Sequence, residues 1–111
     1  MSDSLPEDWL ATWVGSGRAP GASGVVEIVV PGAPEGQGAW VVRVDDGVVT
    51  EAAAGPPADP DVTLTITYAD ALAIAERSLD PSVAFMQGRL KTAGDPGLVL
   101  DVLAAAGSIG A

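Results

Sequence analysis

Residues 61–103 constrain the fold more than any other stretch of the sequence. From Asp61 they read Asp-Val-Thr-Leu-Thr-Ile-Thr, so apolar residues at 62, 64 and 66 alternate with threonines. A period of two built from aliphatic and β-branched residues is typical of a strand with one buried face. Three short helical segments are expected after this strand, and together they carry more apolar surface than one sheet face needs as cover. The stretch therefore predicts an unusually apolar interior between a sheet and helices.

The first of these helices is expected directly after the strand. Thr67-Tyr68-Ala69-Asp70 has the Thr-x-x-acid form of a capping box, which satisfies the free amides of a helix N-terminus. We expect this helix to bury the apolar residues that follow at helical spacing, which are Leu72, Ala75 and Leu79.

Two Asp-Pro pairs predict two further helices. Asp80-Pro81 begins one, because Asp accepts hydrogen bonds from first-turn amides and Pro lacks a donor that has no partner there. Gly88 is expected to end it, since glycine adopts the left-handed cap without Cβ strain. Asp95-Pro96 begins the last helix, which we expect over Gly97–Ala106 with Gly107 as its end. Residues 89–93 between the two helices are long enough only for a strand.

The N-terminal residues predict another helix. Ser4-Leu5-Pro6-Glu7 again has the form of a capping box, and the helix that it begins spaces Leu5, Trp9 and Trp13 four residues apart. We expect this helix to dock on the sheet through the tryptophan pair. The alternative is that one indole also forms a wall of a ligand cavity, since aromatic rings often line pockets.

Three strands are expected between this helix and residue 61. Val25–Val30 is nearly apolar on both faces, which favours a central strand. Ala39–Val44 and Val48–Ala53 flank the turn dipeptide Asp46-Gly47 and predict an antiparallel hairpin. Residues 15–24 and 31–38 are expected to be loops, and the prolines of 55–60 predict a rigid connector. The sequence therefore predicts one α+β domain over residues 1–111 with an antiparallel meander.

Composition excludes several functional classes. The chain holds five Lys plus Arg against fifteen Asp plus Glu, a net charge of −10, which repels phosphate backbones and anionic membranes. Nucleic acid is therefore excluded as an expected partner, and stable membrane insertion is not expected because no apolar run approaches the length of a membrane span. The polar and acidic N-terminus carries no secretory signal pattern, which favours a cytoplasmic location.

The sequence offers little for catalysis. It contains no His and no Cys, so thiolate nucleophiles, imidazole bases and sulfur-ligated metals are excluded, and we expect no enzyme and no cofactor. Asp59 and Asp61 flank Pro60, but two carboxylates are too few for a calcium site. Asp70, Asp80 and Asp95 are interpreted as helix caps rather than catalytic groups.

One run of residues resembles a known family. From Leu79 the sequence reads Leu-Asp-Pro-Ser-Val-Ala-Phe-Met-Gln-Gly-Arg-Leu-Lys-Thr-Ala-Gly-Asp, and Asp-Val-Thr-Leu-Thr-Ile precedes it. This pattern is similar to the core signature of the sterol carrier protein type 2 lipid-binding domain, and it covers roughly the C-terminal half. Thr92 departs from the family pattern, in which an aliphatic residue is usual at that position. The resemblance implies a five-stranded, mostly antiparallel sheet covered on one side by about four helices, with an apolar tunnel between the layers.

The resemblance also implies a function and a set of residues. It implies non-catalytic binding, with transfer, of an apolar lipid such as a fatty acid, an acyl-CoA or a sterol-like molecule. The residues expected to line the tunnel are Phe85, Met86, Leu90, Leu72, Leu98, Leu103 and Trp40. The alternative is an accessory or dimerisation module without a ligand of its own, which would act as a homodimer or with a partner enzyme. An enzyme is the third hypothesis, and it requires a carboxylate with a strongly raised pKa inside the cavity.

Overall fold

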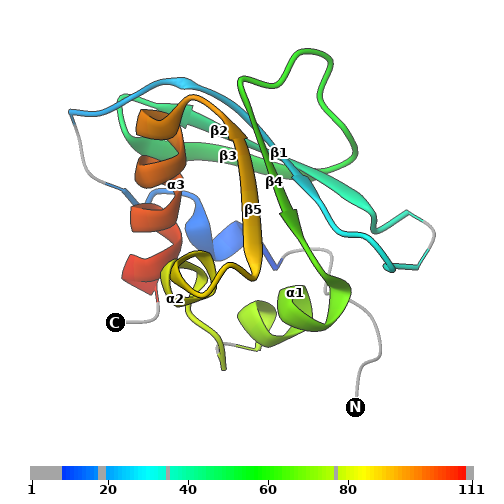
Figure 1. Cartoon of the computed structure of the whole chain (residues 1–111). Coiled ribbons are helices and arrows are strands. Elements are labelled where there is room, and N and C mark those ends of the chain that lie inside the picture. Colours follow the sequence, from blue (N-terminus) through cyan, green and yellow to red (C-terminus); the bar gives the residue numbers. More distant parts are fainter. Residues whose placement is uncertain (1–8, 18–19, 35, 77, 110–111) are drawn as a thin grey trace.

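The computed structural model describes residues 9–17, 20–34, 36–76 and 78–109 and has the α+β architecture that the sequence predicts (Figure 1). The elements, in chain order, are the 3-10 turn η1 (Ala11–Trp13), β1 (Gly24–Val29), β2 (Ala39–Asp45), β3 (Val48–Ala54), β4 (Val62–Ile66), α1 (Tyr68–Ala75), α2 (Pro81–Met86), β5 (Leu90–Gly94) and α3 (Pro96–Ile109). Within these residues there are three α-helices, and they lie on one side of the sheet together with η1.

The strands of the described residues form one five-stranded sheet in the order β3-β2-β1-β4-β5. β1 is the middle strand, as its two nearly apolar faces predict. The β1–β2, β2–β3 and β4–β5 pairs are antiparallel, whereas β1 and β4 are parallel. The predicted antiparallel meander is confirmed for β1, β2 and β3. The sheet as a whole is mixed, because β4 pairs with β1 in parallel.

Asp61 explains how β4 comes to lie beside β1. Its backbone N–H donates to the carbonyl oxygen of Val25 at 2.8 Å, and its carboxylate Oδ2 accepts from the N–H of Val25 at 2.8 Å. This pair of bonds fixes the start of β4 next to the start of β1, so both strands run in the same direction. The connector from Gly55 crosses from the edge strand β3 to reach this position.

The hairpin of β2 and β3 has the predicted turn. Asp46 and Gly47 have φ angles of 54° and 83°, both positive, as the central residues of a type I′ turn require. Along the strands burial alternates as expected: Trp40, Val42 and Val44 are buried on one face. The predicted hairpin and its turn are confirmed, and the β2–β3 pairing shifts register between Arg43 and Val44.

The predicted caps of the three α-helices are confirmed. Thr67 Oγ1 accepts from the N–H of Asp70 at 3.3 Å, and Asp80 Oδ1 accepts from the N–H of Ser82 at 2.8 Å. Asp95 Oδ1 accepts from the N–H of Gly97 at 2.9 Å. These bonds satisfy first-turn donors that a helix leaves without intrahelical partners.

Two details of the helices differ from the prediction. α1 buries Ala71 and Ile74, whereas Leu72, Ala75 and Leu79 are only partly buried against the core. The helix ends at Ala75, so Leu79 lies beyond it and the face turned to the sheet is set by the short segment 68–75. α3 continues past Gly107 to Ile109, because a single glycine is tolerated within a helix at a cost of about 1 kcal/mol.

The N-terminal helix is only partly within the described residues. Leu5 lies outside them, and the described part of this segment forms the single turn η1 rather than a longer helix. Trp9 and Trp13 are both buried in the core, with 6% of each residue exposed, and η1 contacts β3 and α3. The tryptophan pair therefore packs into the core as predicted.

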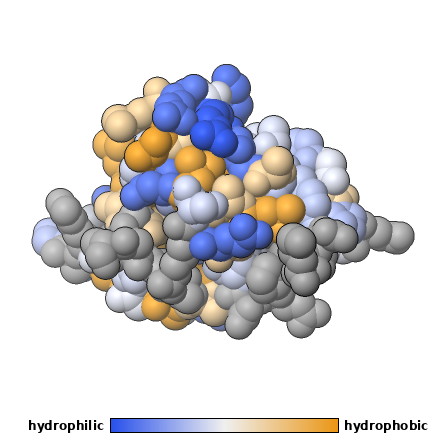
Figure 2. Space-filling view, turned by 90° about the horizontal axis from the view of Figure 1, so that it is seen from below, coloured by the Kyte–Doolittle hydropathy of each residue, from blue (hydrophilic) through white to orange (hydrophobic). Residues whose placement is uncertain are grey.

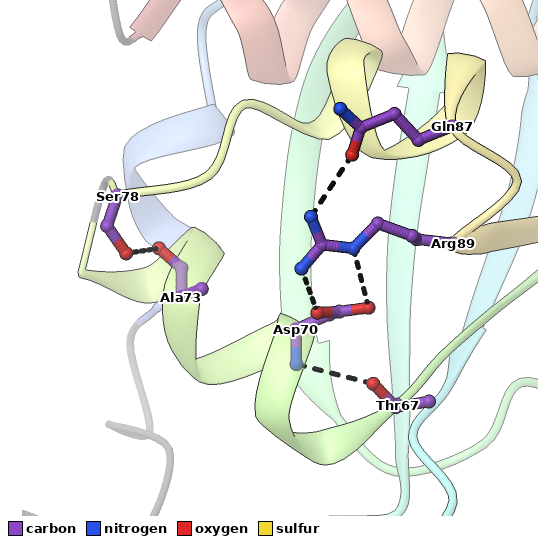
Figure 3. A network of polar contacts seen from close by, with 6 residues as sticks. All are labelled: Thr67, Asp70, Ala73, Ser78, Gln87 and Arg89. Atoms are coloured by element: carbon purple, nitrogen blue, oxygen red, sulfur yellow. Dashed lines mark hydrogen bonds and ion pairs between the residues drawn. The ribbon is translucent and has the colours of Figure 1, made fainter.

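A polar network outside the core joins α1 to the segment between α2 and β5 (Figure 3). The guanidinium of Arg89 donates to both carboxylate oxygens of Asp70, at 2.6 and 3.4 Å, and to the amide oxygen of Gln87 at 3.1 Å. Bonding to Arg89 holds the pKa of the Asp70 carboxyl below its ordinary value of 3.8. The same contact raises the pKa of Arg89.

The lowered pKa of Asp70 makes the stability of the fold depend on pH. The ionised carboxylate stabilises the folded state at pH above 3.8, and this contribution is lost as pH falls through the lowered folded-state pKa. Arg89→Gln should therefore lower the free energy of unfolding at neutral pH, and the difference from the parent should shrink well below pH 3.8. Urea denaturation at several pH values measures this difference.

Arg43→Gln is the matched control for this prediction. Arg43 pairs with Glu51 at 3.3 Å, but more than half of each side chain is exposed, so the pair should contribute little at any pH. A destabilisation by Arg89→Gln that is equal at neutral and at acidic pH would contradict the assigned role of Asp70.

Candidate functional site

The interior between the sheet and the helices is the candidate site, and its chemistry is uniform. All buried residues of the described chain are apolar, and no charged or hydrogen-bonding side chain is buried there apart from the indoles. The side chains come from the segment around η1, from one face of the sheet and from the three α-helices, and they form one contiguous cluster. Such a surface can bind apolar groups, and it offers no acid, base or nucleophile to a reactant.

The structure brings five of the predicted tunnel residues together. Trp40, Leu98, Leu103 and Leu90 are buried in the same cluster, with exposed fractions of 1%, 0%, 4% and 6%. Leu72 lies at its margin, partly buried against it. β2, β5, α1 and α3 thus contribute to one apolar interior. Whether these residues contact a ligand remains a prediction, and so does the tunnel itself.

The other two predicted residues lie elsewhere. Phe85 is 36% exposed and Met86 is 77% exposed, because the short helix α2 turns Pro81 and Ala84 inward instead. Figure 2 shows apolar surface on the side where α2 and α3 lie in Figure 1. The exposed side chains therefore belong to the outer surface in this structure, separate from the five buried or half-buried residues.

β5 contributes only one buried side chain to the interior. Leu90 is buried, while Lys91, Thr92, Ala93 and Gly94 are exposed. Thr92 lies on the same face of the strand as Leu90 and pairs with the buried Leu64 of β4. The helical cover of the sheet therefore ends short of the middle of β5.

Three tryptophans form an aromatic cluster within the core. The ring centroids of Trp9 and Trp13 are 6.0 Å apart, those of Trp9 and Trp40 are 5.8 Å apart, and both pairs are edge-to-face. Such arrangements are favourable for aromatic quadrupoles. Trp40 Nε1 donates to the carbonyl oxygen of Gln37 at 2.9 Å, whereas Trp9 Nε1 is buried and has no acceptor in the part of the chain that the structure describes.

Sequence reasoning found the tryptophan pair but not its contact with Trp40. The four-residue spacing of Trp9 and Trp13 predicts that they share a stripe, and strand alternation places Trp40 on the core face. Neither pattern says which strand the stripe meets, because that contact depends on tertiary packing.

The titratable groups with resolved pKa shifts are peripheral. They are Asp70 and Arg89, which belong to the surface network between α1 and the α2–β5 segment. The carboxylate of Asp61 accepts a hydrogen bond from the backbone N–H of Val25, which is a structural role. Within the described residues there is no group of three or more potential metal ligands.

None of the helices in the described part of the chain is both long and apolar enough to cross a bilayer.

Comparison with known proteins places this architecture in a family. The SCP-2 sterol transfer family matches residues 12–106. Sterol carrier protein 2 of Rattus norvegicus is 38% identical over an alignment of 80 residues, which covers 69% of this chain but only 14% of the rat protein. The chain therefore spans a small part of that relative.

Solved structures have the same arrangement. The solution structure of palmitated SCP2L2 from Aedes aegypti has a TM-score of 0.60 at 26% identity, over 77% of this chain and 73% of that one. A crystal structure of sterol carrier protein 2 has a TM-score of 0.66 at 21% identity, over 95% and 92%, a likeness that shows a shared fold.

The family match spans the sheet, α1, α2 and most of α3, so it includes the elements that enclose the interior. Lipid binding and transfer are the general functions of this family. The chain belongs to the SCP-2 sterol transfer family.

Proposed function

We propose that this protein binds an apolar lipid in its interior, without chemical conversion, and passes it on. The ligand class is a fatty acid, a fatty acyl-CoA or a sterol-like molecule. The observation that carries the proposal is the purely apolar character of the buried residues, which come from a sheet and helices that the family match includes. The palmitated relative from Aedes aegypti supports a fatty acyl chain as one ligand.

Burial of methylene groups provides the expected affinity. About twelve buried methylenes contribute roughly 10 kcal/mol at ~0.8 kcal/mol each. Association costs at least about 4 kcal/mol in lost translational and rotational freedom. The remaining ~6 kcal/mol corresponds to a dissociation constant of tens of micromolar. Such loose binding suits a protein that releases its ligand again.

The five clustered residues are the proposed ligand contacts. Trp40, Leu90, Leu98 and Leu103 lie within the cluster, and Leu72 lies at its margin. Phe85 and Met86 are proposed to contact the lipid from the outer surface of α2 while it is taken up, because they are exposed in this structure. The proposed tunnel would open beside β5, where Thr92 is exposed.

A pair of tryptophan substitutions on α3 tests the interior site. Leu103 is 4% exposed and Leu100 on the same helix is 60% exposed. Leu103→Trp should fill the binding space and weaken the binding of a fluorescent fatty acid about tenfold, while Leu100→Trp should change it less than about twofold. Fluorescence titration measures both, and circular dichroism verifies that each variant folds.

Overpacking by the indole can itself prevent folding, so Leu103→Phe serves as a milder second variant. It should weaken binding in the same direction by a smaller factor. An interior site would be contradicted if substitutions at positions 103 and 100 weakened binding equally. It would also be contradicted if the parent bound no lipid at about 100 µM.

The outer surface of α2 and α3 favours a second candidate function. Large apolar side chains are exposed there on Val83, Phe85, Met86 and Leu100. Exposed apolar groups that gather on one surface often mark protein interaction sites. They support the alternative of an accessory or dimerisation module that works with a second copy or with a separate enzyme.

Met86→Glu separates the two candidates. A carrier that is monomeric should bind lipid, and the variant should slow lipid uptake from neutral vesicles several-fold without changing the sedimentation coefficient. Val14→Glu is the control, since Val14 is 43% exposed but lies near η1. A dimer that Met86→Glu dissociates, together with no lipid binding, would favour the accessory module.

A further inference from the structure

Trp9 carries a buried hydrogen-bond donor without a partner among the described residues. Only 6% of the residue is exposed, and its indole Nε1 has no acceptor within the described residues. A buried donor without an acceptor loses its hydration and gains nothing in return. The indole N–H of Trp40, by contrast, has an acceptor, since Nε1 donates to the carbonyl oxygen of Gln37 at 2.9 Å. The N–H of Trp9 therefore calls for an acceptor that the described residues do not supply.

The position of this donor is within the proposed binding interior. The indole of Trp9 packs edge-to-face against Trp40, with centroids 5.8 Å apart, and against Trp13 at 6.0 Å. All three belong to the apolar cluster that also contains Leu98 and Leu103. In the described chain, Trp9 Nε1 is the single buried side-chain polar atom without a partner. A lipid in this interior would meet one hydrogen-bonding group among apolar walls.

The charges of the protein restrict the acceptor. No Lys or Arg is buried among the described residues, and the chain carries a net charge of −10. A carboxylate moved into this interior would lose its hydration without gaining a counter-ion, which is strongly unfavourable. An uncharged oxygen, such as an ester carbonyl or a hydroxyl, loses far less hydration and accepts the same bond.

We propose that Trp9 Nε1 donates a hydrogen bond to an uncharged oxygen of the bound lipid and so selects esters and alcohols over plain hydrocarbons. This inference rests on the proposed lipid-binding function. A fatty acid keeps its carboxylate in water and inserts only its chain, so it does not use this donor. Trp9 thereby gives an otherwise apolar interior one specific contact.

Trp9→Phe tests the proposal, because phenylalanine keeps an aromatic ring and lacks the N–H. The probes are 1-dodecanol, dodecane and laurate, which share one chain length, and each displaces a fluorescent hydrocarbon from the purified protein. The variant should bind 1-dodecanol about tenfold more weakly, whereas its affinities for dodecane and laurate should change less than about twofold.

Trp13→Phe is the matched control, since Trp13 lies in the same aromatic cluster and is equally buried. Its substitution should change the affinities for all three probes by a common factor through packing alone. The ratio of 1-dodecanol to dodecane affinity separates the lost hydrogen bond from general loosening of the core.

Nuclear magnetic resonance of the indole groups in the parent protein provides a second readout. The Trp9 Nε1 proton should move downfield when 1-dodecanol binds and should move little with dodecane. An indole proton that is shifted upfield and insensitive to every ligand would show an N–H directed at an aromatic ring instead, and would overturn the proposal.

The outcomes distinguish this inference from the function on which it rests. If the parent protein binds none of the three probes, both fall. If it binds all of them and Trp9→Phe changes every affinity equally, lipid binding stands and the role of Trp9 is refuted.

Discussion

Burial of one apolar face of the sheet is the constraint on which the rest of the structure depends. β1, β2 and β4 turn alternate side chains to the same side, and the residues buried there are valines, leucines, isoleucines and Trp40. Removal of this surface from water is the main favourable contribution to folding. Short helices, each fixed by a cap, supply the opposite wall. The interior of the described chain is therefore apolar on both sides, which suits an apolar ligand.

Polar interactions are placed where they define the arrangement of the elements without entering this interior. Asp61 fixes β4 against β1, and Asp101 accepts from the N–H of Ala22 at 2.6 Å, which ties α3 to the segment before β1. Arg89 and Asp70 join the segment between α2 and β5 to α1 at the surface. The described residues thus keep their charged groups outside the apolar interior. Trp9 Nε1 is the buried polar atom without a partner among them, and we propose it as the point of selectivity.

Local signals made much of this fold predictable. Caps at Thr67, Asp80 and Asp95 depend on a few adjacent residues, and strand alternation depends only on a period of two, so both could be read from the sequence. The parallel pairing of β1 with β4 could not, because it depends on contacts between residues far apart in the chain.

The candidate site also combines residues whose placement could be predicted with residues whose placement depends on tertiary packing. Leu98 and Leu103, which the resemblance implies as interior residues, lie in the core. Met86 is exposed because the orientation of a six-residue helix is set by its packing on α3, which periodicity over so few residues does not determine. The contact of Trp9 with Trp40 likewise arises only when η1 meets the sheet.

Native mass spectrometry of the purified protein incubated with a fatty acid and with a long-chain alcohol tests the central claim most directly. If the apolar interior is a binding site, each lipid should appear as a complex of one ligand per chain, and Leu103→Trp should reduce that complex. If only the bare protein is detected with both lipids, its folded state being intact, the interior is a packed core and the protein is not a lipid carrier.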